Sequence, residues 1–198
     1  VWANHSDSRY SDYRYFWYYL FIQVLEIFYR RRSVMDFFIR NLSTLGPVGT
    51  NLPAPGTFGS LAGLVVFCFL FWFSPLSPIG IMILFSVLFI VGIPLSTRAE
   101  VLLGKEDPPE VIWDEFTSIP LVFAFCLDEL NSFSITKVLF FLTMGFILFR
   151  IFDIAKPVGI KKLQKLPKGM GVMIDDLAAA LVSALLLYVL KTFPLSFL

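Results

Sequence analysis

The chain has 198 residues, of which 57% are hydrophobic and 23 are phenylalanine, and its mean hydropathy is +0.77. These values exceed those of ordinary soluble domains, and several uncharged runs approach the length that crosses a bilayer. The composition therefore predicts an all-α fold, a polytopic membrane helical bundle with four to five apolar helices. The formal net charge of +1 excludes the strong positive field with which proteins attract nucleic acid.

The first 34 residues are expected to be an extension, interfacial or non-native, that precedes a membrane domain at residues 35–198. Residues 15–28 are rich in aromatic side chains and are followed by three arginines at positions 30–32. About 14 apolar-leaning residues are short for a membrane span and are typical of an interfacial helix. Residues 35–51 then form a short amphipathic stretch that leads into the first span.

Four apolar segments are predicted to cross the membrane as helices, and a fifth is predicted to cross as a kinked helix. The four regular spans are residues 61–73, 79–95, 133–151 and 177–190. The segment Asp107-Pro108-Pro109-Glu110 has the sequence of a helix start, with an aspartate cap, proline in the first turn and glutamate three residues after the cap. This fifth helix is expected to bend at Pro120 and to end at Asp128 and Glu129.

Lysine and arginine are distributed unequally between the two sides of the predicted bundle. One side holds residues 30–32, 96–110 and 156–168 and collects nearly every basic residue, whereas the other keeps Lys137 and Lys191. Basic residues are enriched in cytoplasmic loops, so the basic side is predicted to be cytoplasmic.

Four polar clusters from distant parts of the chain fall at the cytoplasmic ends of their predicted helices. They are the turn at residues 55–60, the acids at 107–115, the group at 150–156 and the segment at 168–176. Acids beside hydrocarbon are costly, so their presence indicates a functional site. In the last cluster, two glycines precede Asp175 and Asp176, near a helix N-terminus that favours anions. Alone, these two acids would equally suit a helix cap at the membrane surface.

The available side chains narrow the chemistry of such a site. The single histidine, His5, lies in the polar N-terminal tail, and Cys68 and Cys126 lie inside apolar runs. These positions exclude phosphatase mechanisms that use a histidine or a thiolate beside the membrane. Clustered carboxylates favour a hard cation such as Mg²⁺, which prefers oxygen ligands and keeps water for its substrate.

Helical spacing suggests how the polar residues of the site are arranged. Glu110 and Asp114 are four residues apart and Arg150 and Asp153 are three apart, so each pair is expected to share a helix face. Lys156 follows Asp153 by three residues and is expected on the same face, where it contacts phosphate. An arginine fork, a lysine and clustered acids together suit phosphoryl-group hydrolysis at a membrane surface.

Four blocks, PAPGTFGSLAGL, EVIWDEF, FRIFDIAKP and GMGVMIDD, occur in this order between about residues 45 and 190. Their combination resembles the phosphatidylglycerophosphatase A family of bacterial lipid phosphatases. The resemblance implies a multi-pass enzyme of the bacterial cytoplasmic membrane with its active site facing the cytoplasm. It also implies Mg²⁺-dependent removal of the terminal phosphate of phosphatidylglycerophosphate, a phospholipid of the cytoplasmic leaflet, to give phosphatidylglycerol.

The resemblance and the residue chemistry together give a set of expected site residues. Those expected to be catalytic and to bind the metal are Asp114, Glu115, Asp153, Asp175 and Asp176. Those expected to bind the substrate phosphate are Arg150, Lys156, Thr57 and Ser60.

Three other functions remain open at this stage. A phosphatase of the same chemistry acting on another lipid or prenyl phosphate is the first alternative. The second is a non-enzymatic ion-binding or transport protein, although transporters place ionisable residues near the bilayer midplane rather than at one face. The third is a structural membrane subunit, which has no need of the clustered acids.

Overall fold

A computed structural model describes residues 7–132, 134–157, 160–163, 166 and 169–193. Its internal contacts divide the chain into two compact units, residues 1–38 and 39–198, and each is described by itself. Every regular element within the described ranges is a helix, which confirms the predicted all-α fold.

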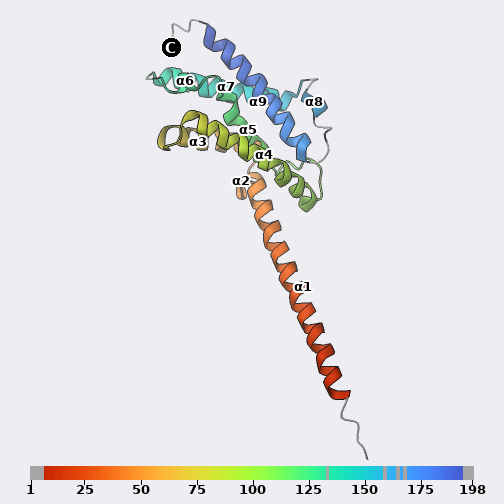
Figure 1. Ribbon diagram of the computed structural model, residues 1–198. Coiled ribbons are helices and arrows are strands. Elements are labelled where there is room, and N and C mark those ends of the chain that lie inside the picture. Colours follow the sequence, from red (N-terminus) through yellow and green to blue (C-terminus); the bar gives the residue numbers. More distant parts are fainter. Residues whose placement is uncertain (1–6, 133, 158–159, 164–165, 167–168, 194–198) are drawn as a thin grey trace, which may run out of the picture. The chain divides into compact units, whose positions relative to one another are not determined.

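The helices follow one another along the chain in the order labelled in Figure 1. They are α1 (Asp7–Ser43), α2 (Pro47–Asn51), α3 (Pro55–Phe73), α4 (Pro78–Leu103), α5 (Trp113–Ser118), the 3₁₀ helix η1 (Ile119–Phe123), α6 (Leu127–Leu130), α7 (Ile135–Ala155), α8 (Ile160–Leu163) and α9 (Gly169–Thr192). Among the described residues, α3, α4, α7 and α9 are long and apolar enough to cross a membrane, by length and composition. This result confirms the predicted membrane bundle.

Each of these four helices is longer than the apolar run that predicted it, because polar residues at its ends are also helical. Proline at position 55 starts α3, where its missing amide hydrogen costs nothing. The hydroxyl of Ser77 accepts a hydrogen bond from the Gly80 amide and caps α4, which ends at Gly104 in the left-handed conformation with φ of 66°. The polar turns that carry the site are therefore parts of the long helices.

The segment formed by α5, η1 and α6 runs beside α9 from one of its ends to the other and consists of three short helices. Asp114 of α5 lies close to Asp176, in the second turn of α9. At the opposite end of α9, Lys191 lies 3.5 Å from an Asp128 oxygen of α6 and 3.8 Å from a Glu129 oxygen. This segment corresponds to the fifth crossing that the sequence predicts, but it is broken rather than continuous and is not among the four candidate spans of the described residues, so that crossing stays a prediction.

A 3₁₀ helix, rather than a simple kink, interrupts this crossing beside Pro120. Proline cannot donate an amide hydrogen bond, and α5 gives way to η1 at Ile119, one residue before it. The ring of Phe123 in η1 stacks on Phe67 of α3 at a centroid distance of 5.4 Å and fills the space beside Gly145 of α7. Thus η1 lies between α3 and α7 in the apolar core.

The predicted helix start at Asp107 is wrong. Asp107 has a left-handed backbone with φ of 47°, and the Val111 amide closes a turn by donating to the Pro108 carbonyl. The next amide, that of Ile112, donates to the Ser43 carbonyl at the end of α1. These bonds hold the segment in an irregular conformation, and the helix begins only at Trp113.

Glu110 therefore does not share a helix face with Asp114, as the four-residue spacing predicted. Its carboxylate lies 3.3 Å from the Lys105 ammonium. A hydrogen bond from its own backbone amide and the nearby Lys105 ammonium hold the pKa of Glu110 below its usual range. Glu110 thus belongs to an ion pair at the protein surface.

The unit at residues 1–38 consists, where described, of the larger part of α1. This helix continues without a break past residue 34, and the predicted boundary between an extension and a membrane domain stays a prediction. Residues 1–6 lie outside the described ranges, as do Lys165 and Lys168 of the predicted basic loop.

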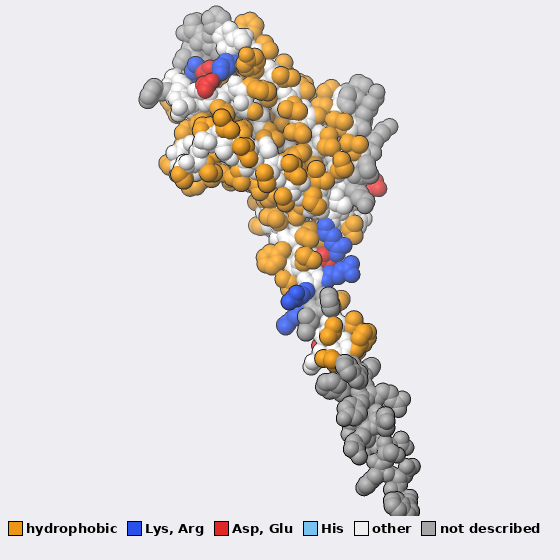
Figure 2. Space-filling model, viewed as in Figure 1, with side chains coloured by type: hydrophobic (Ala, Val, Ile, Leu, Met, Phe, Trp, Pro, Cys, Tyr) orange, Lys and Arg blue, Asp and Glu red, His pale blue; other side chains and the backbone are white. Residues whose placement is uncertain are grey.

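Apolar side chains cover most of the face of residues 39–198 that Figure 2 presents. Near α6, acidic and basic side chains interrupt this surface, where Glu129 also pairs with Lys137 at the start of α7. An apolar surface of this kind is what hydrocarbon covers in a membrane bundle.

Candidate active site

The site forms where the ends of α3, α5, α7 and α9 meet. These four elements come from distant parts of the sequence, as the order of the blocks requires, and α5 packs against both α3 and α9. They bring together the predicted site residues Ser60, Asp114, Glu115, Arg150, Asp153, Lys156, Asp175 and Asp176. Thr57 lies beside them in the first turn of α3, and its role in phosphate binding stays a prediction.

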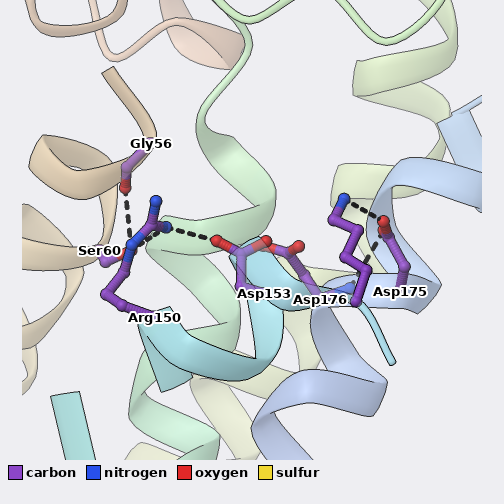
Figure 3. Close-up of polar contacts among 7 residues, drawn as sticks. Gly56, Ser60, Arg150, Asp153, Asp175 and Asp176 are labelled. Atoms are coloured by element: carbon purple, nitrogen blue, oxygen red, sulfur yellow. Dashed lines mark hydrogen bonds and ion pairs between the residues drawn. The ribbon is translucent and has the colours of Figure 1, made fainter. Parts of the chain in front are cut away.

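One ion pair links α7 to α3. The Arg150 Nη1 atom lies 2.5 Å from the Asp153 carboxylate on the same helix face, as the three-residue spacing predicted. The same nitrogen donates to the hydroxyl of Ser60 at 3.2 Å, and that hydroxyl donates to the Gly56 carbonyl at 2.9 Å (Figure 3). A chain of hydrogen bonds thus runs from α3 across to Asp153.

A second ion pair links the end of α7 to α9. The Lys156 Nζ atom lies 2.5 Å from one Asp175 oxygen, and the other oxygen accepts the Asp176 amide at 3.1 Å. Burial acts to lower the pKa of Lys156, but its bond to Asp175 and the neighbouring acids outweigh this effect and raise it above the usual range. Lys156 is therefore a cation that Asp175 holds in place.

The expectation that Lys156 shares a helix face with Asp153 is wrong. Lys156 has a left-handed backbone with φ of 38° and ends α7, so the helical spacing no longer applies at this residue. Pro157 follows directly and cannot continue the helix. The turn aims the lysine side chain at α9 instead.

Three carboxylates remain without a basic partner among the described ion pairs. Asp114, Glu115 and Asp176 each present an oxygen atom, and these atoms all lie within 4.8 Å of one another. Each of the three residues has one buried carboxylate oxygen with no hydrogen-bond partner. Asp114 is 5% exposed and Asp176 is 2% exposed, so little water reaches this trio.

The trio has the donor set that a divalent cation requires. Two unit negative charges at this separation repel by about 3 kcal/mol even at an effective dielectric constant of about 20. A hard cation with oxygen ligands would cancel this repulsion and give the orphaned oxygens a partner. The residues therefore fit a metal such as Mg²⁺, and Asp153 and Asp175 differ from the trio in being paired with basic groups.

Two features of the site were not predicted from the sequence. A Cβ atom added to Gly56 would overlap the Glu115 carboxylate, so a side chain at this position would displace that carboxylate from its present place. The hydroxyl of Ser118 is fully buried with no partner, four residues after Asp114 on α5. The second feature had a signal in the sequence, since a spacing of four residues places both side chains on one helix face.

A helical membrane bundle with clustered acids beside an arginine and a lysine at one end has the architecture of a membrane-embedded phosphatase. A sequence profile of the phosphatidylglycerophosphatase A family matches residues 41–191, which include every residue of the site. The chain therefore belongs to the phosphatidylglycerophosphatase A family, and it is a phosphatase, as the sequence resemblance implied.

Individual relatives agree with this assignment. The chain is 33% identical over 164 residues to a phosphatidylglycerophosphatase A of Haemophilus influenzae, covering 77% of this chain and 94% of that protein. It is 31% identical to the Escherichia coli protein of the same name, and the match covers 68% of this chain and 72% of that protein. It is also 30% identical to a putative phosphatidylinositol-3-phosphatase of Bacteroides thetaiotaomicron, and the match covers 70% of this chain and 84% of that protein. No solved structure matches the chain significantly.

The buried Lys156–Asp175 pair generates a prediction about stability. Lys156→Met leaves the Asp175 carboxylate buried without its cation, and we expect it to lower the free energy of unfolding by about 3 kcal/mol. Adding Asp175→Leu removes the orphaned charge, so the double variant should recover most of that loss. Denaturant unfolding in detergent micelles measures both.

The matched control for this cycle is Lys105→Met, which breaks the more exposed pair with Glu110. Exposed ion pairs contribute little, so this change should cost less than about 1 kcal/mol. Equal losses for Lys105→Met and Lys156→Met, or a double variant no more stable than Lys156→Met, would contradict a buried pair at Lys156 and Asp175.

Proposed function

We propose that this protein hydrolyses the terminal phosphate of phosphatidylglycerophosphate, in phospholipid biosynthesis, and that the reaction depends on Mg²⁺. The observation that carries the proposal is the buried carboxylate trio, which adjoins two basic side chains at one end of a membrane bundle. The names of the Haemophilus and Escherichia relatives support this choice of substrate. The products are phosphatidylglycerol and inorganic phosphate.

The trio would hold the metal ion. Asp114, Glu115 and Asp176 supply oxygen ligands from two helices, and their buried oxygens have no other hydrogen-bond partner. Bound there, Mg²⁺ would supply charge neutralisation at the phosphoryl group and a more acidic water. The sequence also assigned Asp153 and Asp175 as ligands. Their bonds to Arg150 and Lys156 support a different role, which is to hold those two cations beside the trio.

The two cations would bind the phosphate. Arg150 has a buried Nε atom with no partner, so its planar fork keeps a donor for a phosphate oxygen while Nη1 stays on Asp153. Lys156 offers a point charge at the end of α7, where its side chain is 25% exposed. Ser60 and Thr57, at the start of α3, complete the predicted phosphate side of the site.

A second candidate substrate comes from the Bacteroides relative, whose name describes a phosphatidylinositol 3-phosphate phosphatase. Both substrates carry a phosphomonoester on the head group of a diacylglycerol lipid. The same trio and cations would serve either reaction, so head-group selection must arise elsewhere in the site. A structural subunit or an ion-binding protein without catalysis would need neither the buried trio nor the free arginine donor.

We also propose that the site lies on the cytoplasmic side of a bacterial inner membrane. Basic residues lie at the site end of the bundle. Arg98 and Lys105 lie near the end of α4, and Lys156 directly follows α7. At the other end, Lys137 and Lys191 are both paired with acids of α6. Basic residues are enriched on the cytoplasmic side, which supports this orientation.

The substrate is tested by phosphate release from purified protein in mixed micelles. We expect hydrolysis of phosphatidylglycerophosphate with Mg²⁺, little with excess EDTA, and recovery when Mg²⁺ is restored. Phosphatidylinositol 3-phosphate, phosphatidate and a prenyl phosphate form the comparison panel. A larger kcat/KM for any of these three would replace the proposed substrate, and full activity in EDTA would remove the metal from the proposal.

The role of the trio is tested by Asp114→Asn and Asp176→Asn. An amide keeps the shape of the side chain but not its charge, so each change should lower kcat by at least about a hundredfold and weaken Mg²⁺ binding. Glu106→Gln, at an exposed acid outside the site, is the matched control and should retain activity. Two folded trio variants with near-normal turnover would reduce these acids to a structural role.

Orientation is tested by single cysteines in a variant without Cys68 and Cys126. Glu106→Cys, beyond the end of α4, should react with an impermeant maleimide only from the cytoplasmic side of inner-membrane vesicles. Asn131→Cys, beyond α6, should react only from the outside. Labelling with the opposite sidedness would place the site on the wrong leaflet for a substrate made in the cytoplasm.

A further inference from the structure

Arg150 lies at the edge of the site that faces α3. In Figure 3 the side chains form a row from Gly56 and Ser60 through Arg150 and Asp153 to Asp175 on the far side. The Arg150 side chain is 15% exposed, whereas that of Asp175 is 1% exposed. The arginine is therefore the more accessible of the two side chains, at the junction of α3 and α7.

The side chains that join α3 to α7 near the site differ from those deeper in the bundle. Deeper in the bundle Phe123 fills the space between these helices, against Phe67 on one side and Gly145 on the other. Near the site, the α3 residues next to Arg150 are Gly56 and Ser60, which have no side chain or a small one. There the hydrogen bond from Arg150 to the Ser60 hydroxyl joins the two helices.

Exposed apolar side chains flank this junction. On α7, Ile147, Ile151 and Ile154 are all exposed and follow the spacing of one helix face, which adjoins Arg150. On α3, Leu61 is exposed directly after Ser60. Both helices are candidate membrane spans, so these side chains lie where hydrocarbon chains lie.

We propose that a diacyl phospholipid carrying a terminal phosphate reaches the site sideways from the bilayer, between α3 and α7. This inference rests on the proposed function, and it assigns the path and the surface that hold the substrate. The phosphate takes the Arg150 donors, including the buried Nε atom that lacks a partner. The acyl chains lie along Leu61 and the three exposed isoleucines, and the Arg150–Ser60 bond opens to admit the head group.

The chemistry of the surface favours a lipid substrate over other occupants. A water-soluble phosphate ester has no acyl chains to contact the apolar flanks. A protein partner would not require an arginine beside the buried acids. The exposed residues Ile83, Val87 and Ile90 on α4 provide the contrast, because they are equally apolar but are not part of the described polar site. They supply matched controls for the junction.

The first test places a bulky ring at the junction. We expect Leu61→Trp and Ile151→Trp to lower kcat/KM by about tenfold or more for long-chain phosphatidylglycerophosphate in vesicles. The loss should be several times smaller for a dihexanoyl analogue presented from water. Val87→Trp on α4 should lower neither value. Equal losses on both substrates, no loss on either, or the same loss with Val87→Trp would overturn the proposed path.

The second test does not depend on catalysis. A photoreactive benzoylphenylalanine at position 61, 151 or 87 is irradiated, with excess EDTA, in vesicles that contain phosphatidylglycerophosphate labelled in its acyl chains. We expect capture at positions 61 and 151 to exceed capture at 87, and Arg150→Ala to reduce it. Capture as strong at position 87 would overturn the path, even for a protein that hydrolyses the lipid. Capture at the junction by a protein without phosphate release would instead contradict the proposed function.

Discussion

Burial of like charges is the constraint on which the arrangement of this bundle depends. Five carboxylates meet two basic side chains at the ends of four helices, and two of the five are neutralised by short ion pairs. The remaining trio concentrates negative charge where little water can screen it. A protein does not keep such a cluster for stability, because replacing buried charges with apolar residues is often neutral or favourable. The cluster is therefore better explained by a functional role than by a contribution to stability.

Much of this arrangement was predicted from the sequence, and the successes and failures have separate physical causes. Hydropathy located the four long spans, because apolar runs of bilayer length have few other uses. Hydropathy missed their ends, since Pro55 belongs to the first turn of α3 and the polar Ser77 caps α4, although both residues are typical of loops. The order of the four polar blocks also predicted correctly that distant acids would meet at one end of the bundle.

Local rules failed where a long-range contact or a change of backbone conformation intervened. The capping pattern at Asp107 predicted a helix, but the bond from Ile112 to the end of α1 holds that segment in turns. Spacing predicted Lys156 beside Asp153, but a left-handed residue ends the helix there and sends the side chain to α9. The Lys156–Asp175 pair and the approach of Asp176 to Asp114 and Glu115 could not be predicted, because they depend on distances between helices that are far apart in sequence.

The broken crossing has a consequence for how the chain is made and inserted. A segment with acids in α5 and α6 and a 3₁₀ turn between them is a poor substrate for insertion on its own, because unpaired carboxylates and irregular backbone are both costly in hydrocarbon. The acids of α6 pair with Lys137 of α7 and Lys191 of α9, which come later in the chain. The segment is therefore stabilised by contacts with helices that follow it in the chain. Both the bundle and the acidic site therefore require α9, which supplies Asp175 and Asp176 at one end and Lys191 at the other.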